Sequence, residues 1–192
     1  MLGGSQRPGS GVALTLAIAA GLAFAGQDPQ APAVPNFHQV DAHVYRGAQP
    51  SEAGLESLVR LGIKTIVDLR DGEAHTSAEQ RAVEALGMRY VSIPMRGLSA
   101  PSDDQISRAL ALLDTPGSSG WPVFVHCKRG ADRTGTVIAC YRITHDHWAG
   151  GKALTEARLH GMSRVEFGMQ QYILHYKSAA SAPSLEHPVG SH

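Results

Sequence analysis

The chain has 192 residues, 43% of them hydrophobic and 18% charged, which is typical of one ordinary globular domain and excludes a fibrous or disordered chain. Lysine plus arginine equals aspartate plus glutamate at 17 each, so no global charge favours nucleic acid or an acidic membrane. Two cysteines are too few for a disulfide scaffold. Because the positive and negative side chains balance, any anion-binding site must be local.

The first 25 residues have the pattern of a secretory signal peptide. Arg7 precedes an apolar run over residues 11–25, which ends in Ala23-Phe24-Ala25. This run is shorter than the ~20 residues that span a bilayer, so we expect export with cleavage after residue 25. A retained membrane anchor and a cytosolic N-terminus are the alternatives. Residues 26–36 are rich in proline and are interpreted as a linker.

Strands and helices are expected to alternate after the linker. Short apolar runs predict strands at 37–40, 43–46, 64–69, 89–94 and 122–126, and amphipathic repeats predict helices at 55–62, 77–86 and 106–113. This order favours an α/β fold with a central, mostly parallel sheet of about four to five strands flanked by helices, with the first two strands as an edge hairpin. The C-terminal half is expected to be helical, at 136–147, 152–160 and 165–177. A disordered tail is predicted over 178–192.

The segment after the last predicted strand is the most informative. Residues 126–135 read HCKRGADRTG, and ligands of open α/β sheets bind beyond the carboxyl ends of strands. Five residues separate Cys127 from Arg133, and a loop of this length can turn successive N–H groups toward an anion. Gly130 permits the positive φ that such a loop needs. A helix that begins near Arg133 adds unpaired N–H groups and the positive end of its dipole.

The residue types in this loop predict covalent phosphate transfer. Helix N-termini and nearby cations stabilise a cysteine thiolate, and an arginine guanidinium grips two phosphate oxygens at once. We therefore expect Cys127 to attack phosphorus in line and form a phosphocysteine that water hydrolyses, without a cofactor. The Thr134 hydroxyl is expected to hydrogen-bond the sulfur. His126 is interpreted as a buried residue that orients loop carbonyls.

The pattern His-Cys-x5-Arg-Thr-Gly resembles the signature of protein tyrosine and dual-specificity phosphatases. The segments 44–50 (VYRGAQP), 63–70 (IKTIVDLR) and 141–143 (YRI) are similar to a bacterial branch of the dual-specificity group, some of it periplasmic. The similarity extends over residues 37–177, the expected phosphatase domain. It implies Cys127 as nucleophile, Arg133 as phosphate ligand, and a substrate loop formed by Lys128, Arg129, Gly130, Ala131, Asp132 and Thr134. It also makes the periplasm the expected compartment.

The general acid is the least defined residue of the predicted site. Families of this type place an aspartate in the loop that corresponds to residues 95–102, which contain no carboxylate. The first candidates are Asp103 and Asp104, and Asp103 is preferred, with Asp132 of the loop as a further candidate. A competing interpretation is that the two acidic residues only favour the first turn of a helix, where the dipole stabilises negative charge.

Several other reactive side chains are interpreted as structural. Arg46 and Arg70 lie at strand ends, but ion pairs with nearby carboxylates are expected for them, from Asp41, Asp68 or Asp71. Cys140 lies ~9 Å along the helix from Thr134 and is expected to be a core cysteine rather than a redox partner. His145 and His147 lack a third ligand at metal spacing, so no metal site is predicted.

The sequence thus predicts a phosphatase that acts on phosphate monoesters, with phosphorylated tyrosine or dual-specificity protein substrates preferred. Lys128 and Arg129 favour an alternative, inositol phosphates or phosphoinositides, unless both side chains are merely solvated. A non-catalytic phosphate-binding module is the alternative of another class. A sulfurtransferase and a low-molecular-weight phosphatase are disfavoured by the Arg-Thr-Gly ending and by the late position of the loop. The expected partner is a phosphorylated protein or a small phosphate ester, with no nucleic acid and no stable membrane association after signal cleavage.

Overall fold

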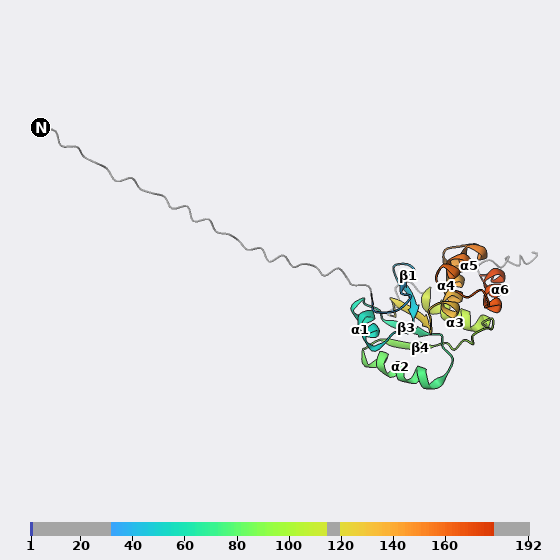
Figure 1. Ribbon diagram of the computed structural model, residues 1–192, viewed down its shortest axis with the longest axis horizontal. Helices are drawn as coiled ribbons and strands as arrows, with labels where there is room; N and C mark the ends of the chain where they lie inside the picture. The colour runs from blue at the N-terminus through green and yellow to red at the C-terminus, as the bar shows by residue number, and fades with distance from the viewer. Residues whose placement is uncertain (2–31, 115–119, 179–192) are drawn as a thin grey trace, which may run out of the picture. The chain divides into compact units, whose positions relative to one another are not determined.

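The structure is a computed structural model that describes residues 32–114 and 120–178, together with Met1. The predicted signal peptide, most of the predicted linker and nearly all of the predicted tail lie outside these residues. No helix of the described part is long and apolar enough to cross a membrane. Its elements, labelled in Figure 1, are β1 (His38–Gln39), β2 (Val44–Ala48), α1 (Glu52–Arg60), β3 (Thr65–Asp68), α2 (Glu73–Ala85), β4 (Arg89–Ser92), α3 (Asp103–Leu113), β5 (Val123–Cys127), α4 (Asp132–His145), α5 (Gly150–Leu159) and α6 (Phe167–His175).

The five strands form one sheet in the order β1-β2-β5-β3-β4, and this confirms the predicted α/β class. β1 and β2 form an antiparallel pair at one edge, as expected, and the remaining pairs are parallel. β5 lies between β2 and β3, with Cys127 beside Ala48 and His126 beside Asp68. The carboxyl ends of three adjacent parallel strands therefore meet around the predicted loop.

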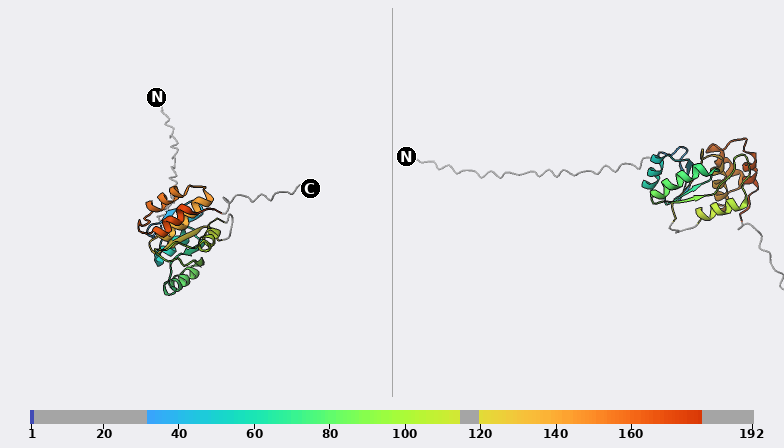
Figure 2. Two further views of the ribbon diagram at one scale, coloured as in Figure 1. Left: turned by 90° about the vertical axis from the view of Figure 1, so that its right-hand side faces the viewer. Right: turned by 90° about the horizontal axis from the view of Figure 1, so that it is seen from below.

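Two groups of helices cover the two faces of the sheet. Alternate side chains of β5 point to opposite faces, because successive residues of a strand do so. Val125 and Cys127 belong to the core under α3 and α4, whereas Phe124 belongs to the core under α1 and α2. Figures 1 and 2 show the same division, with α3 to α6 on one side of the sheet and α1 and α2 on the other. The nucleophile and the histidine before it consequently face different cores.

α4 is the central helix of the C-terminal half. One side of it packs on the sheet through Val137 and Ile138, and the other contributes Ala139 to a second core with α5 and α6. A helix that is covered on both sides needs apolar residues all round. Gly135 allows close packing, since a Cβ there would lie 3.3 Å from the Cβ of Ala157. This double packing fixes the N-terminus of α4, where the predicted loop ends.

The folded domain begins before residue 37, inside the segment that the sequence assigned to a linker. The side chain of Val34 is buried in the core under α1 and α2. The backbone N–H of Ala33 donates to the Ser57 hydroxyl at 3.2 Å. Proline-rich composition alone did not reveal this packing, because one buried valine leaves no periodic pattern.

Candidate active site

Three successive backbone carbonyls of the loop, in residues 128–130, are held by groups outside it. The Gln49 N–H donates to the first at 3.4 Å, the Asn36 amide donates to the second and third at 3.1 and 3.0 Å, and Arg46 Nη2 donates to the third at 2.8 Å. Because the C=O and the following N–H of a planar peptide point in opposite directions, anchored carbonyls turn the N–H groups of the loop away from their partners. The loop is thus shaped as an anion-binding nest.

Gly130 allows the loop to lie directly against β2. Its φ is +67°, as the sequence predicted for this position. A Cβ here would lie 2.3 Å from both the carbonyl carbon and oxygen of Gly47, a distance that no side chain tolerates. Position 130 therefore requires glycine for both conformation and space.

Arg46 brings a buried positive charge to the loop. Its side chain is 1% exposed, and its Nε and Nη1 atoms have no hydrogen-bond partner among the described residues. Burial lowers the pKa of Arg46 to about 10, while the charges of Glu156 and Cys127 act in the opposite direction, so the guanidinium stays charged at neutral pH. The expected ion pair with Asp41 is wrong, since the Asp41 carboxylate accepts instead from the Tyr141 hydroxyl at 2.8 Å.

A pocket of about 260 Å³, lined by polar and charged residues, opens at the carboxyl ends of β2, β3 and β5. This is below the ~300–1,000 Å³ of pockets for drug-sized ligands. Arg133 Nη1 lies 2.9 Å from Asp71 Oδ1 and donates to the Met95 carbonyl at 3.2 Å. Each strand end supplies part of the wall, which consists of Gln49, Arg70, Asp71, Lys128 and Arg133.

Cys127 lies next to this pocket and is almost fully buried. It is the last residue of β5, is 2% exposed, and directly precedes the pocket residue Lys128. The Thr134 hydroxyl is also buried, and it has no hydrogen-bond partner among the described residues. The expected bond between this hydroxyl and the sulfur is therefore not formed here, although the hydroxyl is available for it.

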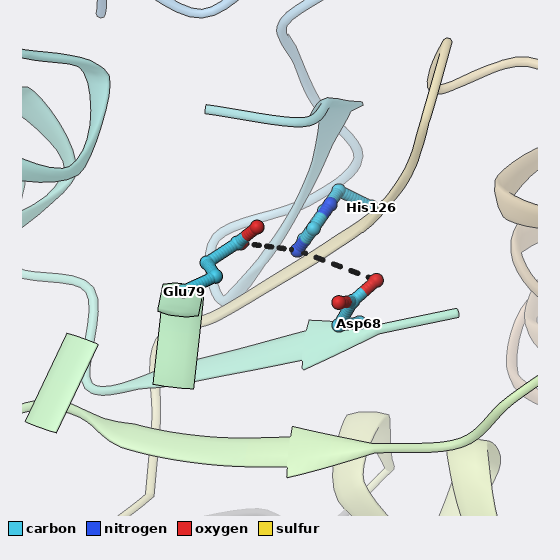
Figure 3. Close-up of side chains that lie close together, drawn as sticks. All are labelled: Asp68, Glu79 and His126. Atoms are coloured by element: carbon cyan, nitrogen blue, oxygen red, sulfur yellow. Dashed lines mark ion pairs between the residues drawn. The ribbon is translucent and has the colours of Figure 1, made fainter. Parts of the chain in front are cut away.

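A buried network of charged groups ties β3, α2 and β5 together (Figure 3). Arg70 Nη2 lies 2.6 Å from Asp68 Oδ2 and 2.6 Å from Glu79 Oε2. His126 Nε2 lies 2.9 Å from Glu79 Oε1 and 3.9 Å from Asp68 Oδ1, but the shorter contact lacks the alignment of a hydrogen bond. The network holds Arg70 at the pocket wall and confirms its expected pairing with Asp68.

Ligand atoms of Asp68, Glu79 and His126 lie within 4.8 Å of one another, a spacing at which three residues could hold a metal ion. The Arg70 guanidinium is already paired with both carboxylates. Burial opposes ionisation of Asp68, but hydrogen bonds from Arg70 and Tyr90 and the His126 charge outweigh it and lower the pKa of Asp68. These contacts explain the cluster as an ion-pair network.

The prediction for His126 was half right. The ring is fully buried, as expected, but neither nitrogen hydrogen-bonds a loop carbonyl. Strand alternation turns it toward α2 and away from the loop, and its ring stacks on Phe124 at 5.8 Å between centroids. The loop carbonyls are positioned by Asn36, Arg46 and the Gln49 backbone instead.

The structure does not bring the preferred acid to the pocket. Asp103 lies in the first turn of α3, and its Oδ1 accepts from the Tyr172 hydroxyl at 2.7 Å. Asp104 lies in the same exposed turn, which Ser102 and Gln105 close with a capping box. Neither aspartate is among the pocket residues.

The remaining loop candidates divide into pocket and structural residues. Lys128 lines the pocket. Arg129 instead pairs with Asp132 at 2.5 Å, and the other Asp132 oxygen accepts from the Ser163 N–H at 2.7 Å. Both oxygens of Asp132 thus have a partner within the protein, and Asp132 is not among the pocket residues. Ala131 precedes α4 as its N-terminal cap.

Four site residues were not anticipated: Asn36, Gln49, Asp71 and Glu79. Gln49 and Asp71 follow predicted parallel strands, so the rule that ligands bind at strand ends was a sufficient signal. Asn36 and Glu79 carry no comparable signal, because their partners lie far away in the sequence.

Comparisons with known proteins agree with this geometry. Residues 29–174 match the family model described as "DSP-PTPase phosphatase fused to NAD+ Kinase". The dual specificity protein phosphatase TpbA of Pseudomonas aeruginosa is 32% identical over 133 residues, covering 69% of this chain and 56% of TpbA. The chain spans about half the length of such curated relatives.

Two crystal structures share the fold. The catalytic core of the PP-IP phosphatase SIW14 from S. cerevisiae, in complex with citrate, is 26% identical with a TM-score of 0.65, covering 76% of this chain and 88% of that one. A TpbA variant in complex with pTyr is 25% identical with a TM-score of 0.64, covering 78% and 87%.

Proposed function

The chain belongs to the DSP-PTPase phosphatase family, and we propose that it hydrolyses phosphate monoesters through a phosphocysteine on Cys127. The observation that carries the proposal is the loop after β5, whose carbonyls are anchored outward while Arg133 lines the adjoining pocket. Such a nest at the start of α4 binds an anion beside the Cys127 sulfur.

Arg133 holds two phosphate oxygens, and the loop N–H groups hold the others while the sulfur attacks in line. The bond between phosphorus and the leaving oxygen breaks as the bond between sulfur and phosphorus forms. Water then attacks the phosphocysteine and restores the thiolate. The Thr134 hydroxyl, buried and without a partner among the described residues, is available to stabilise the sulfur as it leaves.

Phosphorylated tyrosine or dual-specificity protein substrates are the proposed class. Support comes from TpbA, whose variant was crystallised with pTyr. The second candidate is an inositol phosphate or phosphoinositide, and one observation favours it. Every residue that lines the described pocket is polar or charged, and the cations Lys128 and Arg133 outnumber the one lining carboxylate, Asp71, which suits a ligand with several phosphates.

The test is phosphate release by the purified full chain from 4-nitrophenyl phosphate, a phosphotyrosine peptide and an inositol pyrophosphate. Cys127→Ser should remove turnover of all three. Cys140→Ala is the matched control, because Cys140 is a buried core cysteine in the middle of α4, outside the loop, and should leave kcat within about twofold. Equal turnover by wild type and Cys127→Ser would overturn the proposal.

We also propose that the protein is a periplasmic member of a bacterial branch of this family. The support is the sequence alone: a basic residue, an apolar run and Ala23-Phe24-Ala25. N-terminal sequencing of protein recovered from cell fractions tests this. A mature chain in the periplasmic fraction that begins after residue 25 is expected, and a chain in the cytosol that retains Met1 would contradict it.

A further inference from the structure

Asp71 is the one carboxylate among the residues that line the described pocket. Its Oδ1 lies 2.9 Å from Arg133 Nη1, and its side chain is 54% exposed, so it faces the pocket opening rather than the core. The carboxylates expected to act as acid are placed differently. Asp103 contacts Tyr172, and both oxygens of Asp132 are occupied.

The turn after β3 fixes the position of Asp71. Arg70 is bound by the Asp68 carboxylate through both its backbone N–H, at 2.9 Å, and its guanidinium, at 2.6 Å. On the other side, Gly72 has a φ of +112°, which turns the chain into α2. Asp71 therefore lies between an anchored residue and a sharp turn, and its side chain is presented at the pocket.

We infer that Asp71 is the general acid of the proposed phosphatase reaction. Before substrate binds, the carboxylate is paired with Arg133, the residue that is to clamp phosphate. A phosphate ester that engages Arg133 with two oxygens takes the place of the carboxylate. The released Asp71 then lies beside the negatively charged phosphate and takes up one proton from the solvent or from a monoanionic ester, because a neighbouring like charge favours the protonated form of a carboxyl group.

The proton balance of the reaction follows from this exchange. As the Cys127 thiolate attacks phosphorus, the Asp71 carboxyl gives its proton to the leaving oxygen, so that an alcohol departs and a phosphocysteine remains. In the second step the Asp71 carboxylate takes a proton from the attacking water. The bond between sulfur and phosphorus breaks, and orthophosphate and the thiolate are formed.

The inference rests on the proposed function, and leaving-group dependence tests it separately. In the full chain, Asp71→Asn should lower kcat for phenyl phosphate and a phosphotyrosine peptide by roughly 10²-fold, the usual size of general acid catalysis. The effect on 4-nitrophenyl phosphate should be less than about tenfold, since this leaving group departs without a proton. Asp71→Glu, which keeps the carboxyl, should recover part of the loss.

Asp103→Asn tests the rival acid. If Asp71 is the acid, Asp103→Asn should change kcat equally for substrates with good and with poor leaving groups. A lower KM with unchanged kcat in Asp71→Asn would overturn the inference, because it would make Asp71 only a competitor of phosphate for Arg133. The inference would also be overturned if Asp103→Asn, and not Asp71→Asn, lowered kcat more for poor leaving groups than for 4-nitrophenyl phosphate. Absence of Cys127-dependent turnover in the wild type would instead remove the proposed function, and the acid with it.

Discussion

The Arg46 guanidinium on β2 donates a 2.8 Å hydrogen bond to the Gly130 carbonyl, 84 residues later in the chain. The same carbonyl accepts from the Asn36 amide at 3.0 Å. Two donors on one oxygen fix the orientation of that peptide, and hence the direction of the N–H groups that follow. The shape of the anion-binding loop thus depends on residues that do not line the described pocket.

Removing the Asn36 amide should impair catalysis more than stability. Asn36 has a φ of +51°, which glycine adopts without strain, so Asn36→Gly keeps the backbone and removes only the amide donor. We expect kcat/KM to fall by about 10-fold, because the loop N–H groups would be less firmly oriented toward the phosphate and the loss is comparable to the free energy of about one hydrogen bond. Thermal unfolding should change by only a few degrees. Unchanged kinetics in this variant would show that Arg46 alone positions the carbonyl.

Gly130→Ala should abolish activity and strongly destabilise the domain. The added Cβ would lie 2.3 Å from the Gly47 carbonyl group, in a backbone conformation that alanine rarely adopts. Gly151→Ala is the control, since a Cβ at this α5 position meets nothing within 4 Å. It should leave activity intact and raise the free energy of unfolding by up to ~1 kcal/mol through helix propensity. Denaturant unfolding and phosphate release measure both effects.

Glu79→Gln should destabilise the protein. The change leaves Arg70 and His126 buried with one carboxylate fewer, and loss of one partner from a buried ion pair costs roughly 3–5 kcal/mol. Glu56→Gln provides the comparison, because its pair with Arg60 is exposed and 4.0 Å long. That variant should change the free energy of unfolding by less than ~1 kcal/mol. Similar denaturation midpoints for the two variants would contradict this account of the network.

His160 should contribute to acid sensitivity. Burial and then the charges of Arg46 and His38 lower the pKa of His160 to about 4, from an ordinary value of 6.5. Between these pH values the unfolded chain binds the proton and the folded chain does not. The contribution of His160 to the free energy of unfolding is therefore fully present above pH 6.5 and is lost as the pH falls toward 4. His160→Gln should show a shallower loss of unfolding free energy between pH 7 and 4.5. Parallel pH profiles for variant and wild type would exclude this contribution.

Local patterns made much of the fold predictable. The strand positions follow from short apolar runs, and the loop follows from the spacing of Cys127 and Arg133 just after the last of them. The edge hairpin and the order of helices were also anticipated. The predicted ends of the helices were less accurate. α2 begins at Glu73 rather than at residue 77, and the sequence gives no start signal there because the N-cap residue, Gly72, forms no side-chain cap.

Contacts between distant segments could not be predicted. Asn36 meets Arg129 across 93 residues, and Asp71 meets Arg133 across 62. Such pairs depend on the order of strands in the sheet, which apolar periodicity does not specify. The sequence shows that residues 95–102 contain no acid, but the carboxylate beside the pocket depends on the pairing of β3 with β5, which the sequence does not specify.

The pairing of Val44–Ala48 with Val123–Cys127 also bears on how the protein folds. These strands join segments almost eighty residues apart, and contacts of high sequence separation form slowly because the intervening chain must first be ordered. The loop reaches its shape only once Gln49, Arg46 and Asn36 are beside it. A chain that has formed its helices but not this strand pair lacks the anchored loop, so phosphate affinity should appear only once this strand pair has formed.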